Sequence, residues 1–235
     1  LPNGASGIRV ENSVNVQIGD IANPNARNEI NGNTLHGVYL SSIAAGARVE
    51  GNRIGVFMTN GATGQVFPVG NGGNGILAVN APGARFTGNQ IYFNGSHGLE
   101  SRSTEGLYIL DNDIGYFQAT DTQAGNTGNG IQLSNCSNFA VENNTVSCNG
   151  GHGIAVEMSP GIASADGIIA GNTIGIAGTG NSSTGNTGFG IRVANAYNLL
   201  IGEPGQGNAV MGNGEGGMRL RHCLDLILQS NAIGT

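Results

Sequence analysis

A repeat decides the fold of this chain, and one of its two shortest copies reads NTGNGIQLSNCSNFAVENNTVSCNGGHGI over residues 126–154. The copy opens on Asn-x-x-x-Gly-Ile at Asn126, carries Asn-x-Val at Asn144, and closes on the next Asn-x-x-x-Gly-Ile at Asn149. From Ile131 to Ile154 the repeat is 23 residues long. An internal repeat of this length predicts a solenoid rather than a single packed domain.

Two series of asparagines follow this repeat through the whole sequence. Both series have eight members, so they indicate the same number of repeat units. Because identical asparagine side chains that stack in register can bond to one another along the stack, we expect two buried asparagine ladders. The first series is Asn3, Asn33, Asn71, Asn94, Asn126, Asn149, Asn186 and Asn213, and the second is Asn28, Asn52, Asn89, Asn112, Asn144, Asn172, Asn208 and Asn231.

The residues between the asparagines have the period of short strands. Apolar pairs such as Ile131/Leu133 and Phe139/Val141 alternate with polar residues, and no stretch sustains a helical period. A glycine stands four residues after each asparagine of the first series, and we interpret it as a corner residue with positive φ. The sequence therefore predicts an all-β fold, a right-handed parallel β-helix of about eight coils.

The segment IGDIANPNARNEINGN at residues 18–33 resembles secreted bacterial proteins with parallel β-helix repeats, within the pectin-lyase-like superfamily. The segments GNTIG at 171–175 and GNTGFGI at 185–191 resemble the same proteins. The resemblance covers nearly the whole chain and implies an extracellular or cell-surface location. Because this superfamily includes lyases, epimerases, hydrolases, tailspikes, adhesins and structural proteins, the resemblance implies a fold without fixing a function.

Composition narrows the partners of the chain. The net charge of −6 disfavours nucleic acid as a partner. The sequence contains no run of 18 apolar residues, so it predicts no membrane span. The last repeat stops within a coil, and neither end carries a capping element. We therefore interpret residues 1–235 as one solenoid within a longer chain, with polysaccharide or neighbouring protein chains joined end to end as its expected partners.

Three insertions interrupt the repeat on alternate coils, at residues 55–73, 115–128 and 175–188. All three leave the coil at the same corner, so we expect them to lie on one edge and to touch one another. Loops on one edge of a solenoid often carry its binding site. Their aromatic rings either form a platform for a sugar or a partner protein, or pack onto the coil beneath. These ligand-binding candidates are Phe57, Phe67, Tyr116 and Phe117.

The resemblance directs the search for a catalytic site to an outer strand face. Residues one and three positions after each corner apolar residue point outward. Arginines on this face could bind an acidic sugar, or they could simply form surface ion pairs. Stacking distance alone would separate Glu100 and Glu157 by roughly 9.6 Å, near the upper limit for an inverting hydrolase. The catalytic candidates are Glu100, Arg102, His152, Glu157 and Arg192.

Histidines precede the corner glycine on coils two, four and six, at His36, His97 and His152. Alternate coils are roughly 9.6 Å apart, too far for these side chains to share a metal ion, so we interpret them as hydrogen-bonded turn residues. Gly151-His152-Gly153 resembles the Gly-His-Gly motif of polygalacturonases. The paired aspartates of that motif are missing, because Asn129-Gly130-Ile131-Gln132 stands where they would lie. We expect no metal and no cofactor.

Two functions of different class remain open. One is a non-catalytic scaffold, adhesion or filament module of an extracellular or cell-surface protein. The other is a polysaccharide-acting enzyme, namely a lyase, an epimerase or a glycoside hydrolase that uses the outer strand face. The two-coil regularity of the insertions favours the scaffold, because an enzyme site normally breaks a repeat in one place. The Gly-His-Gly match favours the enzyme, although the chain has no lysine to serve as a lyase base.

Overall fold

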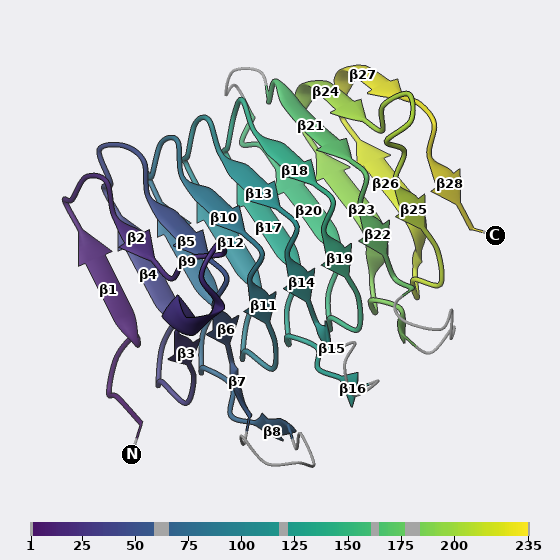
Figure 1. The fold of residues 1–235 in the computed structure, drawn as a ribbon. Coiled ribbons are helices and arrows are strands. Elements are labelled where there is room, and N and C mark those ends of the chain that lie inside the picture. The colour runs from purple at the N-terminus through teal and green to yellow at the C-terminus, as the bar shows by residue number, and fades with distance from the viewer. Residues whose placement is uncertain (1, 59–65, 118–121, 161–164, 177–183, 235) are drawn as a thin grey trace.

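The computed structural model describes residues 2–58, 66–117, 122–160, 165–176 and 184–234, and of residues 57, 58, 66 and 67 it describes only the backbone. Within these ranges the chain winds through eight coils, each of which adds one strand to each of three parallel sheets (Figure 1). The predicted right-handed parallel β-helix is confirmed. The described residues contain no α-helix, and the turn η1 (Pro24–Ala26) is a short 3₁₀ helix.

Strands of the same sheet lie one coil apart. The first sheet consists of β1 (Ile8–Glu11), β4 (Val38–Ser41), β9 (Ile76–Val79), β12 (Leu99–Arg102), β17 (Ile131–Ser134), β20 (Ile154–Glu157), β23 (Phe189–Ala194) and β26 (Gly216–Arg221). The second consists of β2 (Gln17–Ile18), β5 (Arg48–Glu50), β10 (Arg85–Thr87), β13 (Tyr108–Leu110), β18 (Ala140–Glu142), β21 (Gly167–Ala170), β24 (Tyr197–Ile201) and β27 (Leu224–Leu228). The third consists of β3 (Glu29–Ile30), β6 (Arg53–Ile54), β11 (Gln90–Ile91), β14 (Asp113–Ile114), β19 (Thr145–Val146), β22 (Thr173–Ile174), β25 (Ala209–Val210) and β28 (Ala232–Ile233).

Both predicted asparagine ladders are present, and every step of each ladder is bonded. In the first, each Nδ2 donates to the Oδ1 of the next asparagine at 2.7–2.9 Å, from Asn3 to Asn213. In the second, the same bonds run from Asn28 to Asn231 at 2.8–3.2 Å. Because the central amides are buried, these bonds satisfy polar groups that would otherwise oppose folding.

The corner glycines serve a different purpose from the expected one. Gly98 is typical: its φ is not positive, but a Cβ there would lie 2.6 Å from Ile114 Cγ2 and 2.7 Å from the carbonyl oxygen of Gly130. The expectation of positive φ was therefore wrong, because what the position requires is close approach between neighbouring coils. Positive φ occurs at other glycines, such as Gly115 (φ 93°) directly after β14.

Strand alternation builds the core from stacked apolar side chains. On β17 the side chains of Ile131 and Leu133 are fully buried, and the register aligns them with the inner residues of the strands on either side. In the third sheet Ile91 and Ile114 stack in the same way. Inward positions are therefore occupied by the core, and chemistry is available only at outward positions and at corners.

The insertions leave the coil after the third sheet, on one edge of the solenoid (Figure 1). The first contains the antiparallel pair of β7 (Val56–Met58) and β8 (Val66–Pro68), and the second contains β15 (Tyr116–Phe117) and β16 (Thr122–Gln123). Val56 and Phe117 share an apolar cluster with Tyr92, which belongs to the short coil between them. The shared edge is confirmed for these two insertions, and the intervening coil connects them. Residues 177–183 of the third insertion lie outside the described residues.

Asn94→Ala should lower the free energy of unfolding by about 1–3 kcal/mol, measured by chemical denaturation. Asn94 Oδ1 accepts from Asn71 Nδ2 at 2.8 Å and from the Asn71 backbone N–H at 3.3 Å, and Asn94 Nδ2 donates to Asn126 Oδ1 at 2.8 Å, so truncation removes three buried hydrogen bonds between coils. Asn25→Ala, at an exposed position of η1, is the control and should leave stability nearly unchanged. Equal stability of the Asn94 variant and the unchanged protein would contradict a structural role for the ladder.

Candidate functional site

Glu100 points outward from β12, yet its side chain is almost completely covered. The residue is 4% exposed, and its Oε1 accepts from Arg102 Nε at 2.6 Å while Oε2 accepts from Asn74 Nδ2 at 2.7 Å. Burial favours the neutral acid, but the bonds from Arg102 and Asn74 outweigh it and hold the pKa of Glu100 below its ordinary value. Glu100 is therefore an ionised, fully bonded carboxylate, which makes it a poor general acid.

Glu157 on β20 forms a second, separate ion pair with Arg192 on the neighbouring strand β23. The strand register places Glu157 in line with Ser134 and Arg102, whereas Glu100 is in line with Gln132. The two carboxylates thus differ by two coils and by two positions along the strand, which separates their backbones by roughly 12 Å. The expected separation of about 9.6 Å counted the stacking distance alone and omitted this offset of two positions along the strand.

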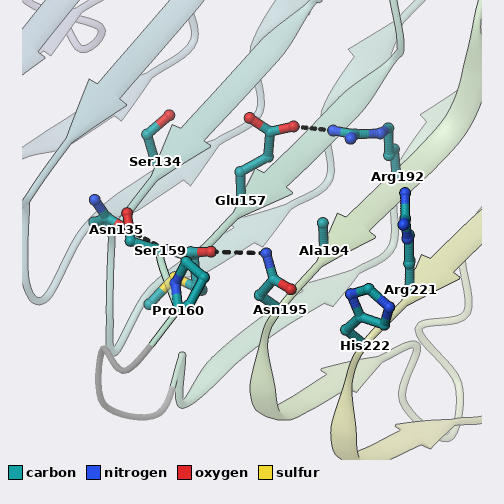
Figure 2. A pocket seen from close by; sticks show the side chains of 11 residues that line it. Ser134, Asn135, Glu157, Ser159, Pro160, Arg192, Ala194, Asn195, Arg221 and His222 are labelled. Atoms are coloured by element: carbon teal, nitrogen blue, oxygen red, sulfur yellow. Dashed lines mark hydrogen bonds and ion pairs between the residues drawn. The ribbon is translucent and has the colours of Figure 1, made fainter.

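A groove of about 640 Å³ runs along the end of the first sheet, beside Glu157 and Arg192 (Figure 2). Its walls are mainly polar. The exposed guanidinium of Arg221 lies beside that of Arg192 in this groove, and the described residues offer Arg221 no ion-pair partner. The lining residues are Ser134, Asn135, Glu157, Met158, Ser159, Pro160, Arg192, Ala194, Asn195, Arg221 and His222.

The corner of the groove includes side chains that the sequence analysis missed. Asn135, Asn195 and His222 each stand four residues after a corner apolar residue and have φ between 52° and 57°. Asn135 Oδ1 accepts from the backbone N–H of Ser159 at 2.7 Å, and Asn195 Nδ2 donates to the carbonyl of Met158 at 3.1 Å. The recurrence of asparagine at this offset is the sequence signal that would have indicated the corner, because asparagine tolerates left-handed backbone.

His152 lies at the opposite end of β20 and does not join the groove. Its Nδ1 accepts from the backbone N–H of Phe189 at 2.9 Å, and burial lowers the pKa of the imidazole. The interpretation of His152 as a hydrogen-bonded turn residue is confirmed. A catalytic set that combines His152 with Glu157 and Arg192 is not formed by the structure, because Nδ1 is already engaged within the fold.

The aromatic platform proposed from the insertions is not formed by Tyr116 and Phe117. Both are 2% exposed, and the Phe117 ring packs edge-on against Tyr92 with centroids 5.5 Å apart. The Phe117 ring is buried because it packs in an apolar cluster with Val56, Tyr92 and Ala124. The side chains of Phe57 and Phe67 lie outside the described residues.

Residues 2–180 match the sequence profile of the family described as a right-handed β-helix region. The chain belongs to this family. Similar solved structures include the A-module of the mannuronan C-5 epimerase AlgE6 of Azotobacter vinelandii (16% identity, 98% of this chain and 60% of that chain, TM-score 0.49). Others are the Dettilon tailspike protein (16%, 98% and 49%, 0.48) and a variant of the periplasmic alginate epimerase AlgG (14%, 83% and 48%, 0.48). The chain thus spans less than two thirds of each, and no curated protein sequence matches it.

The part of the chain that the structure describes contains no group of three or more histidine, cysteine, aspartate or glutamate side chains that could hold a metal ion. In the same part, none of the helical structure is long and apolar enough to cross a membrane.

Asp113 is a second acidic residue whose surroundings the sequence did not reveal. On β14 its Oδ2 accepts from the hydroxyl of Tyr92 at 2.8 Å, while Oδ1 is buried without a partner. Burial raises the pKa of Asp113 to about 6, against an opposing effect of the Tyr92 bond. Folding thus favours the neutral acid relative to the unfolded chain, so ionisation of Asp113 destabilises the fold.

Asp113→Asn should increase the free energy of unfolding at about pH 7.5 by on the order of 1–3 kcal/mol. The folded-state pKa is raised, so the stability that Asp113 contributes is present below its ordinary value of 3.8 and lost as the pH rises through about 6. Asparagine keeps the acceptor for Tyr92 and removes the charge. The gain should therefore shrink as the pH falls toward about 4, which denaturant titrations at several pH values would measure.

Asp111→Asn is the matched control, because Asp111 is exposed two residues away and asparagine tolerates its φ of 56°. It should change stability much less than Asp113→Asn. A loss of stability in Asp113→Asn at neutral pH would contradict the assignment of a destabilising charge.

Proposed function

We propose that this chain is a non-catalytic β-helical module of an extracellular or cell-surface protein, and that the groove beside β23 and β26 binds a segment of acidic polysaccharide. The observation that carries the proposal is the pair of guanidinium groups of Arg192 and Arg221 in one groove, whose described lining residues include a single carboxylate, Glu157. Guanidinium groups recognise carboxylates by paired hydrogen bonds, and uronate units offer one carboxylate each.

The absence of a suitably placed acid and base among the described residues of this face supports binding without turnover. Glu100 is covered and bonded to Arg102 and Asn74, and Glu157 is paired with Arg192. Hydrolysis of a glycoside needs two carboxyl groups that flank one bond, one of which must remain protonated. The bonds of Glu100 to Arg102 and Asn74 and its lowered pKa both disfavour this arrangement.

The solenoid itself supports a scaffold role. Every described coil is bonded to the next by two asparagine steps, which are buried between the central coils, so the outer face is held at a fixed spacing. A rigid, regularly spaced face suits the recognition of an extended polymer, because the protein loses little conformational entropy when the polymer binds.

Binding of polygalacturonate and alginate oligosaccharides, measured by isothermal titration calorimetry, tests the proposal. Arg221→Ala should weaken binding roughly tenfold or more, because a charged hydrogen-bonded contact contributes about 1.5–3 kcal/mol. Arg85→Ala is the matched control, since Arg85 lies on the second sheet and stacks on Tyr108 instead of lining the groove. A neutral oligosaccharide should not bind.

The same oligosaccharides, incubated with the protein and assayed for new reducing ends and for unsaturated products, should remain intact. Cleavage that disappears in Glu157→Gln or Glu100→Gln would overturn the non-catalytic proposal in favour of a polysaccharide-acting enzyme. Equal affinity of Arg221→Ala and the unchanged protein would exclude the groove as the binding site.

A further inference from the structure

A third column of side chains joins the coils at the corner before the first sheet. It is formed by the residues directly before the corner glycines, and histidine alternates with asparagine along it. The backbone N–H of Asn74 donates to His36 Nδ1 at 3.0 Å, and the N–H of His97 donates to Asn74 Oδ1 at 3.0 Å. The histidine–asparagine column consists of His36, Asn74, His97, Asn129 and His152.

The alternation continues without a break toward the C-terminal coils. The backbone N–H of Asn129 donates to His97 Nδ1 at 2.9 Å, and that of His152 donates to Asn129 Oδ1 at 2.7 Å. The last step is the bond from the N–H of Phe189 to His152 Nδ1 at 2.9 Å. Histidine and asparagine therefore perform the same task, which is to offer one acceptor to the backbone of the next coil.

The bonds define the protonation state of the three imidazoles. A nitrogen that accepts an N–H must carry a lone pair, so Nδ1 is unprotonated and the proton of the neutral ring is on Nε2. A second proton on Nδ1 would turn the acceptor into a donor that faces another donor. Each protonation event therefore removes one bond between two coils.

The packing leaves little room for the rings to rearrange. A Cβ on Gly73 would lie 2.7 Å from His36 Nδ1, and a Cβ on Gly128 would lie 2.7 Å from His97 Nδ1. On the next histidine coil, a Cβ on Gly188 would approach His152 Nδ1 still more closely. Glycine on the following coil is thus what admits each imidazole, and a ring that lost its bond would remain confined against backbone.

Acidic, basic and aromatic side chains all lie near the histidine–asparagine column. Glu100 and Arg102 act on both His36 and His97, Glu157 acts on His97 and His152, and Arg192, Glu215 and Arg219 act on His152. The Tyr39 ring stacks on His36 and the Phe189 ring is tilted against His152. Burial is the largest influence on all three imidazoles and lowers each pKa below 6.5.

The column also fixes side chains of the outer face. Asn74 Nδ2 donates to Glu100 Oε2 at 2.7 Å, and Asn129 Nδ2 donates to Gln132 Oε1 at 2.7 Å. A coil whose histidine bonds are broken therefore loses support for the asparagine that positions the neighbouring outer-face residue.

We propose that the histidine–asparagine column is an acid-sensitive lock, in which three neutral imidazoles join coils two to seven at one corner and their protonation loosens that corner together with the outer-face side chains it holds. Because the imidazole pKa values are lowered on folding, the stability from the column is fully present above about pH 6.5 and is lost as the pH falls below it. The lock does not depend on what the groove binds.

The sequence itself supplies the variant that tests the lock. Asparagine occupies the same column position on the intervening coils. A triple variant that combines His36→Asn, His97→Asn and His152→Asn therefore keeps an acceptor at each position and removes the three titrating groups. When the pH is lowered from about 7.5 to about 4.5, the thermal midpoint of the unchanged protein should fall. The thermal midpoint of the triple variant should fall by several degrees less. His222→Asn, a histidine outside the column, should follow the unchanged protein. Parallel pH profiles of the triple variant and the unchanged protein would overturn the proposal.

A measurement on the unchanged protein covers the case in which the triple variant does not fold. Long-range ¹H–¹⁵N NMR correlations should show three imidazoles with unprotonated Nδ1 and protonated Nε2 at neutral pH, and these should vanish from the spectrum of the matching single variants. A proton on Nδ1 of these rings at neutral pH would overturn the lock.

Discussion

The hydrogen bond between stacked asparagine amides is the interaction on which this solenoid depends. A coil of about 23 residues cannot bury a core of its own, so it is stable only when neighbouring coils cover it. An asparagine at a buried corner makes that stacking specific, because its amide has both a donor and an acceptor and can bond in both directions along the axis. Asn94 bonds to Asn71 on one side and to Asn126 on the other. A shift in register would leave such amides buried without partners, at a cost that hydrophobic stacking alone would not impose.

Close stacking also explains why glycine is so abundant. The coils approach until the carbonyl oxygen of Gly130 lies 2.7 Å from where a Cβ of Gly98 would be, and the imidazoles of the histidine–asparagine column are accommodated in the same way by Gly128 and its equivalents. Three ladders result, two made of asparagine and one in which histidine alternates with asparagine. All of them use one side chain per coil to bond the next coil, but only the third contains groups that titrate near neutral pH.

The same geometry limits what chemistry the outer face can perform. Side chains of one column repeat along the axis at the strand spacing, and side chains two positions apart on a strand form another column. Glu100 and Glu157 belong to different columns, and each is paired with an arginine within two coils. A face of this kind presents charges at fixed intervals, which suits an extended charged polymer better than it suits attack on one bond.

Much of the fold could be predicted from the sequence, because stacking is periodic and periodicity is visible in one dimension. The two asparagine series determined the number of coils, the ladders and the shared edge of the first two insertions.

What tertiary structure alone decided are the properties that depend on which residues of other coils cover a side chain. Glu100 points outward as predicted, but it is buried because Asn74 and Arg102 close over it. Phe117 lies in an insertion as predicted, but its ring is buried against Tyr92 of the neighbouring coil. The pKa of Asp113 is raised because its carboxyl group is buried beside Tyr92. Tyr92 belongs to the neighbouring coil, where residues of the first two insertions pack against it. The contacts of Asp113 with Tyr92 and of Glu100 with Asn74 join residues more than 20 positions apart, and a repeat pattern records spacing along the chain without recording those contacts.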